Sequence, residues 1–511
     1  MTRNLKGMDS ITQPRMEICD LPIEILETIF DHLPVTDLKN ASLVCLQWSH
    51  LAFSGRRMNR IRYQIQRNGS LRSGFSILQA SQRQYRHIGC LVGDERMHRE
   101  LIQFLQSRYK FVESLWVEEH ALACLENHPK VEDDFMPMTV FHHLSAVSIA
   151  FLRQNTLDVL DICTIAPNLQ EISMNCNTEY ALEVFRHFRL QLKSVEVIFN
   201  IIYSHTNTVD PFCEIIFPEL LEIVVSIDGA LHCMLSPNSA FITGSKRLQH
   251  ATLNCFITEE IVDSLVENCC DITHLAIDLT MLNDSSLNGL AKLTKLKILK
   301  LEGTSGDNCP FASCPKWDGA PRNFRPCLPI PSLRELFLTC YPFEDCRFDF
   351  VIEICKVMPN LDKVVLGEHF LDPCTVENIC YSMPTLKCLV LMGDFTESTD
   401  KQISREVIRY LGQLRNLVEL RFVYIEFSYG VIANIPELPK LSVLSFYECR
   451  GVTESNILEL DILFPSLRMV NIYPNECISD SSLESLRSRL PWYTVITRNK
   501  RKYHRDKKKI L

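Results

Sequence analysis

The sequence predicts an α/β chain in which a small N-terminal cluster of helices is followed by a curved solenoid of alternating short parallel strands and helices. An apolar phrase of the form L-x-x-L-x-L returns fourteen times between Val112 and Ile472, with segments of helical periodicity in between. Ahead of this array, Cys19–Phe53 carries apolar residues at helical spacing. A chain of 511 residues is too long for one simple core, which also favours a repeat array.

The N-terminal cluster is predicted to contain three short helices. Ile25, Leu26, Ile29 and Leu33 share one face of the first, and Pro34 ends it. Two further helices follow, with apolar residues at helical spacing at Leu38, Ala41 and Cys45 and then at Trp48, Leu51 and Ala52. A unit of about 35 residues buries too little surface to be stable alone. Its apolar face therefore needs a partner, which is either the rest of the chain or another protein.

The repeated phrase allows Ile, Val, Phe or Cys, as well as Leu, at its apolar positions. Its fourteen copies begin at Val112, Leu144, Leu169, Leu192, Leu220, Leu248, Ile272, Leu296, Leu333, Leu361, Leu386, Leu417, Leu441 and Leu467. The spacing between first residues is mostly 23 to 32, the period of leucine-rich repeats with longer loops. A faint phrase at Tyr85-x-x-Ile88-x-Cys90 precedes the array, and Trp492–Thr497 is expected to be a final strand.

Each phrase predicts a short strand with one face turned inward, because its L-x-L half alternates. Helical patterns such as Thr258–Asn268 lie between the phrases. A single strand–helix unit cannot bury its own apolar face, so neighbouring units are expected to stack into a solenoid.

The N-terminal residues also show a specific resemblance. The order Leu21-Pro22-x-Glu24-Ile25-Leu26-x-x-Ile29-Phe30-x-x-Leu33, continued by Asp37-Leu38, Val44-Cys45 and Trp48, is similar to an F-box. Together with the array behind it, the chain resembles the F-box proteins with leucine-rich repeats. The alternative is an ordinary helical cap on the repeats, which explains the apolar faces but not the order of these residues.

The resemblance implies a substrate receptor of a ubiquitin ligase, itself non-catalytic and without a cofactor. The F-box would dock on a Skp-type adaptor and through it reach the cullin and the RING subunit, while the repeats hold an unknown protein substrate. The residues it assigns to the adaptor are Leu21, Pro22, Ile25, Leu26, Ile29, Leu33, Leu38, Val44, Cys45 and Trp48. Some of these will pack inside the F-box, and the sequence does not separate the two groups.

The expected organisation is a disordered lead at 1–15, an F-box at 16–60, a solenoid at 61–497 and a basic tail at 498–511. In each strand the residue between the two apolar positions, and the one just after the second, should point outward on the concave side. The large side chains at these positions are Trp116, Phe337, Arg421, Tyr447 and Tyr473. They are the candidate substrate contacts, because aromatic residues and Arg are enriched at binding hot spots.

Charge is unevenly distributed. Gly55–Gly93 holds eight arginines and no acidic residue, which predicts a solvated basic junction. The alternative is a patch that binds anions or nucleic acid, and the small number of aromatic residues in the stretch argues against it. The basic tail has a net charge of +7 and the whole chain has a net charge of −9, so residues 1–497 have a net charge of −16. The tail is a solvated segment, a nuclear-localisation signal or a nucleic-acid contact. Two other functions stay open. One is an F-box scaffold that acts outside ubiquitination. The other is a nucleic-acid- or chromatin-associated repeat protein that uses its basic tail, although the acidic charge of the solenoid argues against that function.

Motifs of enzymes and of metal sites are missing from the sequence. It has no G-x-x-x-x-G-K-[ST], G-x-G-x-x-G, G-x-S-x-G, H-E-x-x-H or C-x-x-C. The Cys- and Pro-rich loop at 302–332 lacks a second cysteine pair, so a surface loop is expected there and no metal. Since no apolar run reaches the length of a membrane span, and the first 20 residues lack the apolar stretch of a signal peptide, we expect cytoplasmic or nuclear localisation and no membrane contact. The 22 cysteines are then reduced, mostly buried thiols.

Overall fold

The computed structural model describes about three-fifths of the chain, which divides into two compact units. Described are residues 18, 21–65, 74, 77–78, 81, 85–92, 111–119, 140–150, 162–176, 178–200, 212, 214–228, 239–254, 257, 259–278, 284–302, 328–339, 355–393, 403–428, 431–472, 478, 481, 485 and 488. The first unit is Met1–Leu169 and the second is Gln170–Leu511. Tyr473, the expected strand Trp492–Thr497, the cysteines of the 302–332 loop and the basic tail lie outside the described residues.

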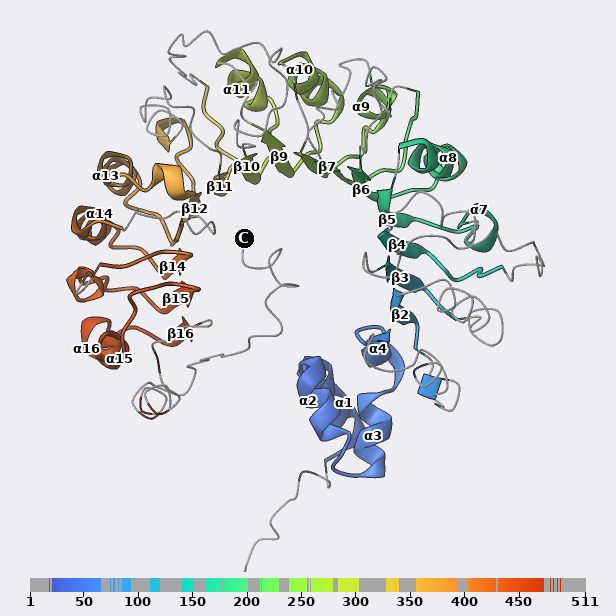
Figure 1. Ribbon diagram of the computed structural model, residues 1–511, viewed down its shortest axis with the longest axis horizontal. Helices are drawn as coiled ribbons and strands as arrows, with labels where there is room; N and C mark the ends of the chain where they lie inside the picture. Colours follow the sequence, from blue (N-terminus) through green and yellow to red (C-terminus); the bar gives the residue numbers. More distant parts are fainter. Residues whose placement is uncertain are drawn as a thin grey trace, which may run out of the picture. The chain divides into compact units, whose positions relative to one another are not determined.

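The first unit begins with helices and continues with parallel strands (Figure 1). The helices are α1 (Ile23–His32), α2 (Val35–Ala41), α3 (Leu46–Ala52) and α4 (Gly55–Met58). The strands are β1 (Arg62–Ile65), β2 (His87–Val92), β3 (Ser114–Glu119) and β4 (Ala146–Ala150), with α7 (Ile162–Ile165) after them. β1, β2, β3 and β4 pair in this order, all in parallel. β2 coincides with the faint early phrase, and β1 was not expected.

In the described part of the second unit, short strands are followed in most cases by a helix or a 3-10 turn. Its strands are β5 (Glu171–Cys176), β6 (Ser194–Asn200), β7 (Glu222–Asp228), β8 (His250–Asn254), β9 (His274–Asp278), β10 (Ile298–Glu302), β11 (Glu335–Leu338), β12 (Lys363–Leu366), β13 (Cys388–Met392), β14 (Glu419–Val423), β15 (Val443–Tyr447) and β16 (Met469–Ile472). Each strand pairs in parallel with the next along the chain.

Helices join consecutive strands of this unit. They are α8 (Thr178–Phe188), α9 (Ala240–Gly244), α10 (Glu259–Asn268), α11 (Asp284–Leu290), α13 (Pro373–Ser382), α14 (Arg405–Tyr410), α15 (Glu454–Leu458) and α16 (Leu460–Leu463), with 3-10 turns η6 (Glu368–Phe370), η7 (Leu411–Gln413) and η8 (Ile432–Asn434). Figure 1 shows the strands of this unit on the inner side of an arc and the helices on its outer side. The fourteen phrases are β3–β16, so the predicted fold class is confirmed.

The core of the repeats lies between strands and helices. The phrase leucines form ladders, as at Leu299 and Leu336, which face each other across β10 and β11 and are fully buried. α10 buries Ile261, Val262 and Leu265 against the strands, as expected for the helical pattern at 258–268. Burial of this kind contributes roughly 1.5–3 kcal/mol per large aliphatic side chain. The stacked units therefore stabilise one another, as a solenoid requires.

The described cysteines behave as small hydrophobic residues. Ten of them are free thiols, and five of those ten are buried. Burial raises the pKa of the Cys90, Cys269 and Cys380 thiols to about 12. At neutral pH they are protonated and chemically quiet. No helix in the described ranges is long and apolar enough to cross a membrane.

Candidate functional site

Helices α1–α3 close around a small core of their own. Its buried residues are Leu26, Phe30, Leu38, Ala41, Leu51 and Ala52. Trp48 packs on it from α3, with its ring in T-shaped contact with Phe30 at a centroid distance of 5.3 Å. Pro22 is the N-cap of α1, and Pro34 is the N-cap of α2. Each proline sits where a missing N–H leaves no hydrogen bond unmade.

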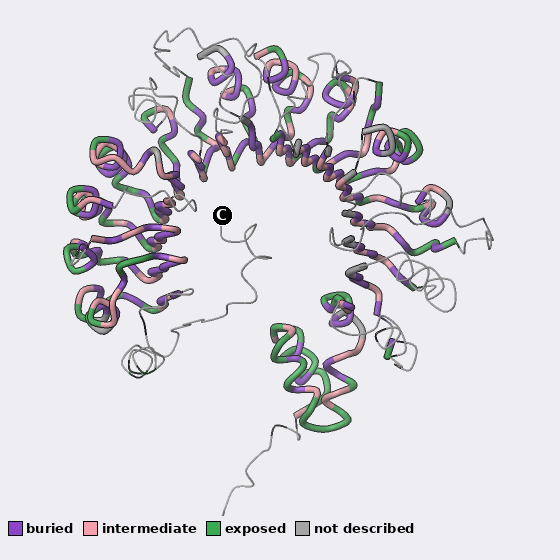
Figure 2. The backbone as a smooth tube through the Cα atoms, in the orientation of Figure 1, coloured by how far each residue is buried: buried purple, intermediate pink, exposed green. Residues whose placement is uncertain are grey.

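Exposed apolar side chains are concentrated on these helices. Of the sixteen large apolar side chains that are exposed among the described residues, seven lie between Ile18 and Leu46. In Figure 2 much of α1–α3 is coloured as exposed residues, whereas the strands are mostly coloured as buried or intermediate. Single exposed apolar residues are ordinary, but a concentration of this kind marks an interaction surface.

Most of the exposed apolar residues of this segment fall into two groups, with Ile18 and Ile23 outside them. Pro22, Ile25 and Ile29 are three and four residues apart, on one face at the start of α1. Leu43–Leu46 covers the end of the connection from α2 and the first residue of α3, and in it Leu43 is 84% exposed and Leu46 81% exposed. We refer to these two groups together as the apolar docking face.

The structure separates the ten residues expected at an adaptor. Pro22, Ile25, Ile29, Val44 and Cys45 are exposed, and Leu21, Leu33 and Trp48 are partly buried against the core. Leu26 and Leu38 are fully buried, so their expected position on the surface is corrected: they hold the helices together. Ile23, Leu43 and Leu46 are exposed although the sequence reasoning did not select them. The run Leu43-Val44-Cys45-Leu46, apolar at every position between two helices, is the signal that could have found the last two.

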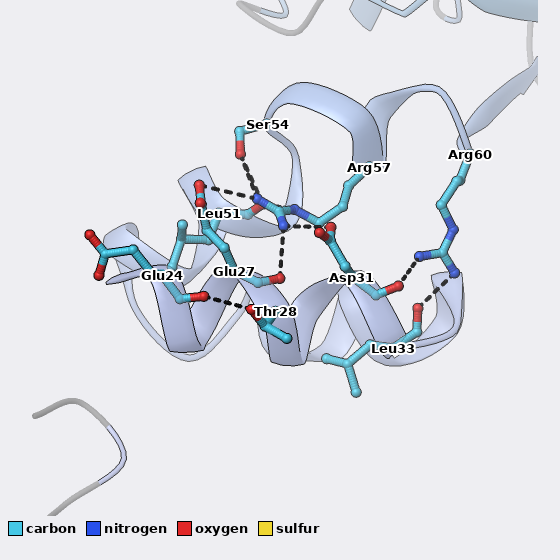
Figure 3. Close-up of polar contacts among 9 residues, drawn as sticks. All are labelled: Glu24, Glu27, Thr28, Asp31, Leu33, Leu51, Ser54, Arg57 and Arg60. Atoms are coloured by element: carbon cyan, nitrogen blue, oxygen red, sulfur yellow. Dashed lines mark hydrogen bonds and ion pairs between the residues drawn. The ribbon is translucent and has the colours of Figure 1, made fainter. Parts of the chain in front are cut away.

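An arginine clamp fixes the helices that carry the docking face (Figure 3). Arg57 is 4% exposed. Its guanidinium donates to the Leu51 carbonyl oxygen at 2.6 Å, to the Glu27 carbonyl oxygen at 3.1 Å and to Asp31 Oδ1 at 2.7 Å. It thereby ties α4 to both α1 and α3.

Arg60 completes the clamp at the end of α1. Its guanidinium donates to the carbonyl oxygens of Asp31 at 2.7 Å and Leu33 at 2.9 Å. These are carbonyls that a helix C-terminus leaves without partners. The expectation that the arginine stretch is a solvated junction is therefore wrong for Arg57, which is a buried structural residue.

The helical cluster is similar to a known family: the model of the F-box-like family matches residues 18–62. These residues form an F-box-like domain, which supports an F-box protein. The matched segment contains α1–α4, the docking face and the whole arginine clamp.

No curated protein matches the chain. Among solved structures, the chain is similar to that titled "Crystal structure of Rad7 and Elc1 complex in yeast", with 13% identity over 70% of this chain and 75% of that chain and a TM-score of 0.33. A likeness at that score supports no inference about this protein.

The strand residues expected to face a substrate have different surroundings. Trp116 is partly buried and lies opposite Gly89 on the neighbouring strand, where a Cβ would come within 3.2 Å of Trp116 Cε3. Arg421 is partly exposed, and its Nε donates to Glu419 Oε1 at 2.7 Å. Both side chains keep some surface for a partner.

Phe337 and Tyr447 are not exposed, so that part of the expectation is wrong. Phe337 is 3% exposed and Tyr447 is 7% exposed. They belong to an apolar cluster with Val365, Val390 and Val423, on the face of the sheet opposite the phrase leucines. The sequence pattern identified the face correctly, but a buried apolar cluster occupies part of this face between β11 and β15, beside partly exposed charged residues such as Arg421.

Proposed function

We propose that the protein is the substrate-recognition subunit of a Skp–cullin–F-box ubiquitin ligase, acting in the cytoplasm, the nucleus or both. The F-box-like domain docks on a Skp-type adaptor. The strand–helix units are leucine-rich repeats that hold a protein substrate, and the chain is a non-catalytic receptor. Holding the substrate near a carried ubiquitin raises its effective concentration at the site of transfer, so a receptor can confer specificity without chemistry of its own.

The observation that carries this proposal is the apolar docking face on an F-box-like domain. Leu43 and Leu46 are more than four-fifths exposed, although a large aliphatic side chain gains roughly 1.5–3 kcal/mol on burial. The arginine clamp holds the helices in place behind them. A rigid apolar surface loses little conformational entropy when a partner covers it, which favours docking.

The test is affinity purification of the full chain carrying Leu46→Asp, with Ile462→Asp as the matched control. Ile462 lies in α16 and is 71% exposed, so the same charge enters a comparably exposed apolar position outside the F-box-like domain. We expect wild type and the control to retain adaptor and cullin, and Leu46→Asp to lose both by at least about tenfold, since burying an unpaired carboxylate in an interface is costly.

Equal retention by Leu46→Asp and Ile462→Asp would contradict the docking face. A wild-type chain that brings down no adaptor would make the helices a mere cap of the repeats. Adaptor without cullin would contradict the ligase assignment and favour a scaffold.

A further inference from the structure

Two lysines converge on one aromatic ring at the sheet face opposite the phrase leucines. Lys300 of β10 and Phe337 of β11 are cross-strand neighbours, and Lys300 Nζ lies 4.7 Å from the centre of the Phe337 ring. Lys363 of β12 reaches the same ring from the other side of β11, with its Nζ at 4.5 Å. One ring thus holds two ammonium groups, each within the distance of a cation–π contact.

The two ammonium groups differ in their carboxylate partners. Lys363 Nζ lies 3.4 Å from Glu335 Oε2, so its charge is offset by a neighbour. Among the described residues Lys300 forms no ion pair with a carboxylate, and its ammonium lies over the Phe337 ring. The side chains of Lys300, Lys363 and Glu335 together carry one net positive charge, and the next charged residue on this face of β10 is Glu302, two residues after Lys300.

The side chains that lie beside these lysines on the same face of the sheet are apolar, and we refer to them as the apolar floor. Phe337, Val365 and Val390 are direct neighbours across β11, β12 and β13 and are each less than 5% exposed. A charge beside such a floor is screened less than one surrounded by water, so an anion next to it is attracted more strongly. Lys300 itself and the Lys363 side chain, 18% exposed, keep access to solvent.

We propose that the sheet face over β10–β12 binds an acidic segment of a protein partner, with one of its carboxylates beside the Lys300 ammonium as Glu335 lies beside Lys363. Carboxylate is the occupant favoured here, because the same cluster already pairs one lysine with a carboxylate and offers point charges, not the bidentate fork of Arg. The identification of this partner as the ligase substrate rests on the proposed function. The binding of an acidic segment to this face is independent of the proposed function.

The experiment measures fluorescence anisotropy of two short labelled peptides with the full chain. One alternates Glu with Ala, and the other has Gln in place of every Glu. The variants are Lys300→Gln, Lys300→Arg and the matched control Lys295→Gln. Lys295 lies outside the strands, is exposed and pairs with Asp271, so its substitution removes the same charge elsewhere. Thermal unfolding of each variant checks that the repeats still fold.

We expect the Glu peptide to bind more tightly than the Gln peptide, and Lys300→Gln to weaken it about tenfold, which corresponds to about 1.4 kcal/mol. Lys300→Arg should keep most of the affinity, and Lys295→Gln all of it. Equal binding of the two peptides, or equal affinity of Lys300→Gln and Lys295→Gln, would overturn the proposal. So would tighter, Lys300-dependent binding of a phosphoserine peptide or of single-stranded RNA, since the carboxylate would then be the wrong ligand.

The two proposals fail separately. Lys300→Gln should leave adaptor co-purification unchanged, because Lys300 lies in the second unit and the docking face in the first. Loss of adaptor binding by wild type with peptide discrimination intact would refute the ligase function alone. The reverse result would refute the acidic-segment site alone.

Discussion

Replacing Arg57 with Ala should loosen the F-box-like domain without unfolding the repeats. The substitution removes the donors of the Leu51 and Glu27 carbonyl oxygens and of Asp31 Oδ1. A hydrogen bond to a charged donor contributes roughly 1.5–3 kcal/mol. Asp31 and Glu27 are about half exposed, so water replaces much of the lost ion pairing, and the carbonyls dominate the cost. We expect the local unfolding free energy of α1 and α3 to fall by about 3 kcal/mol.

Hydrogen exchange of the full chain measures this locally, because amides in α1 and α3 report the opening of these helices alone. A fall of about 3 kcal/mol accelerates their exchange by about two orders of magnitude. The matched control is Arg60→Ala, which removes two hydrogen bonds from an exposed arginine at the end of α1. We expect it to cost about 1 kcal/mol.

Equal exchange rates in Arg57→Ala and Arg60→Ala would refute the clamp. A uniform acceleration across β5–β16 would refute its locality.

Two further predictions concern the second unit. Gly451→Ala should lower the unfolding free energy of this unit by at least about 2 kcal/mol in chemical denaturation, because Gly451 has φ +74° and a Cβ there would lie against the Phe427 carbonyl oxygen. The matched control is Gly289→Ala, where the Cβ meets only a side-chain oxygen at 3.4 Å and the unfolding free energy should rise by about 0.5–1 kcal/mol. Equal losses of stability in the two variants would refute the argument. Burial, and then the charge of His250, lower the pKa of His274, so the folded state binds a proton less readily than the unfolded state and stability should fall as the pH drops below the ordinary histidine value. His274→Asn should flatten that fall in a pH series of unfolding curves, and an unchanged slope would refute it.

The repeats could be predicted from the sequence because their signal is local. Each phrase places two apolar residues on one face of a strand, and β3–β16 all coincide with a phrase. β1 was missed because Arg62–Ile65 has no leading leucine, and only Ile65 is buried in it. Arg62–Ile65 forms a strand because its backbone pairs with the edge of β2, even though its apolar pattern is weak.

The arginine clamp could not be predicted in the same way. Composition shows eight arginines without an acid between Gly55 and Gly93, which indicates a solvated stretch. The partners of Arg57 are Glu27 and Asp31, thirty and twenty-six residues earlier in the chain. A pairing across that distance depends on how α4 returns to α1, and no local pattern records it. The division of the F-box apolar residues into core and surface has the same origin.

The burial of Phe337 and Tyr447 shows where the outward face of the repeats changes character. In β8 and β10 buried and accessible residues alternate, whereas β12 and β13 each contain three consecutive buried residues. Strands buried on both faces read as continuous apolar runs, and Val364-Val365-Leu366 and Leu389-Val390-Leu391 are such runs. Alternation alone therefore predicts which face a residue is on, and the apolar run predicts whether that face is open. Lys300 lies in the last strand before this change, next to Phe337, so a bound carboxylate there would meet an accessible charge at the edge of an apolar floor.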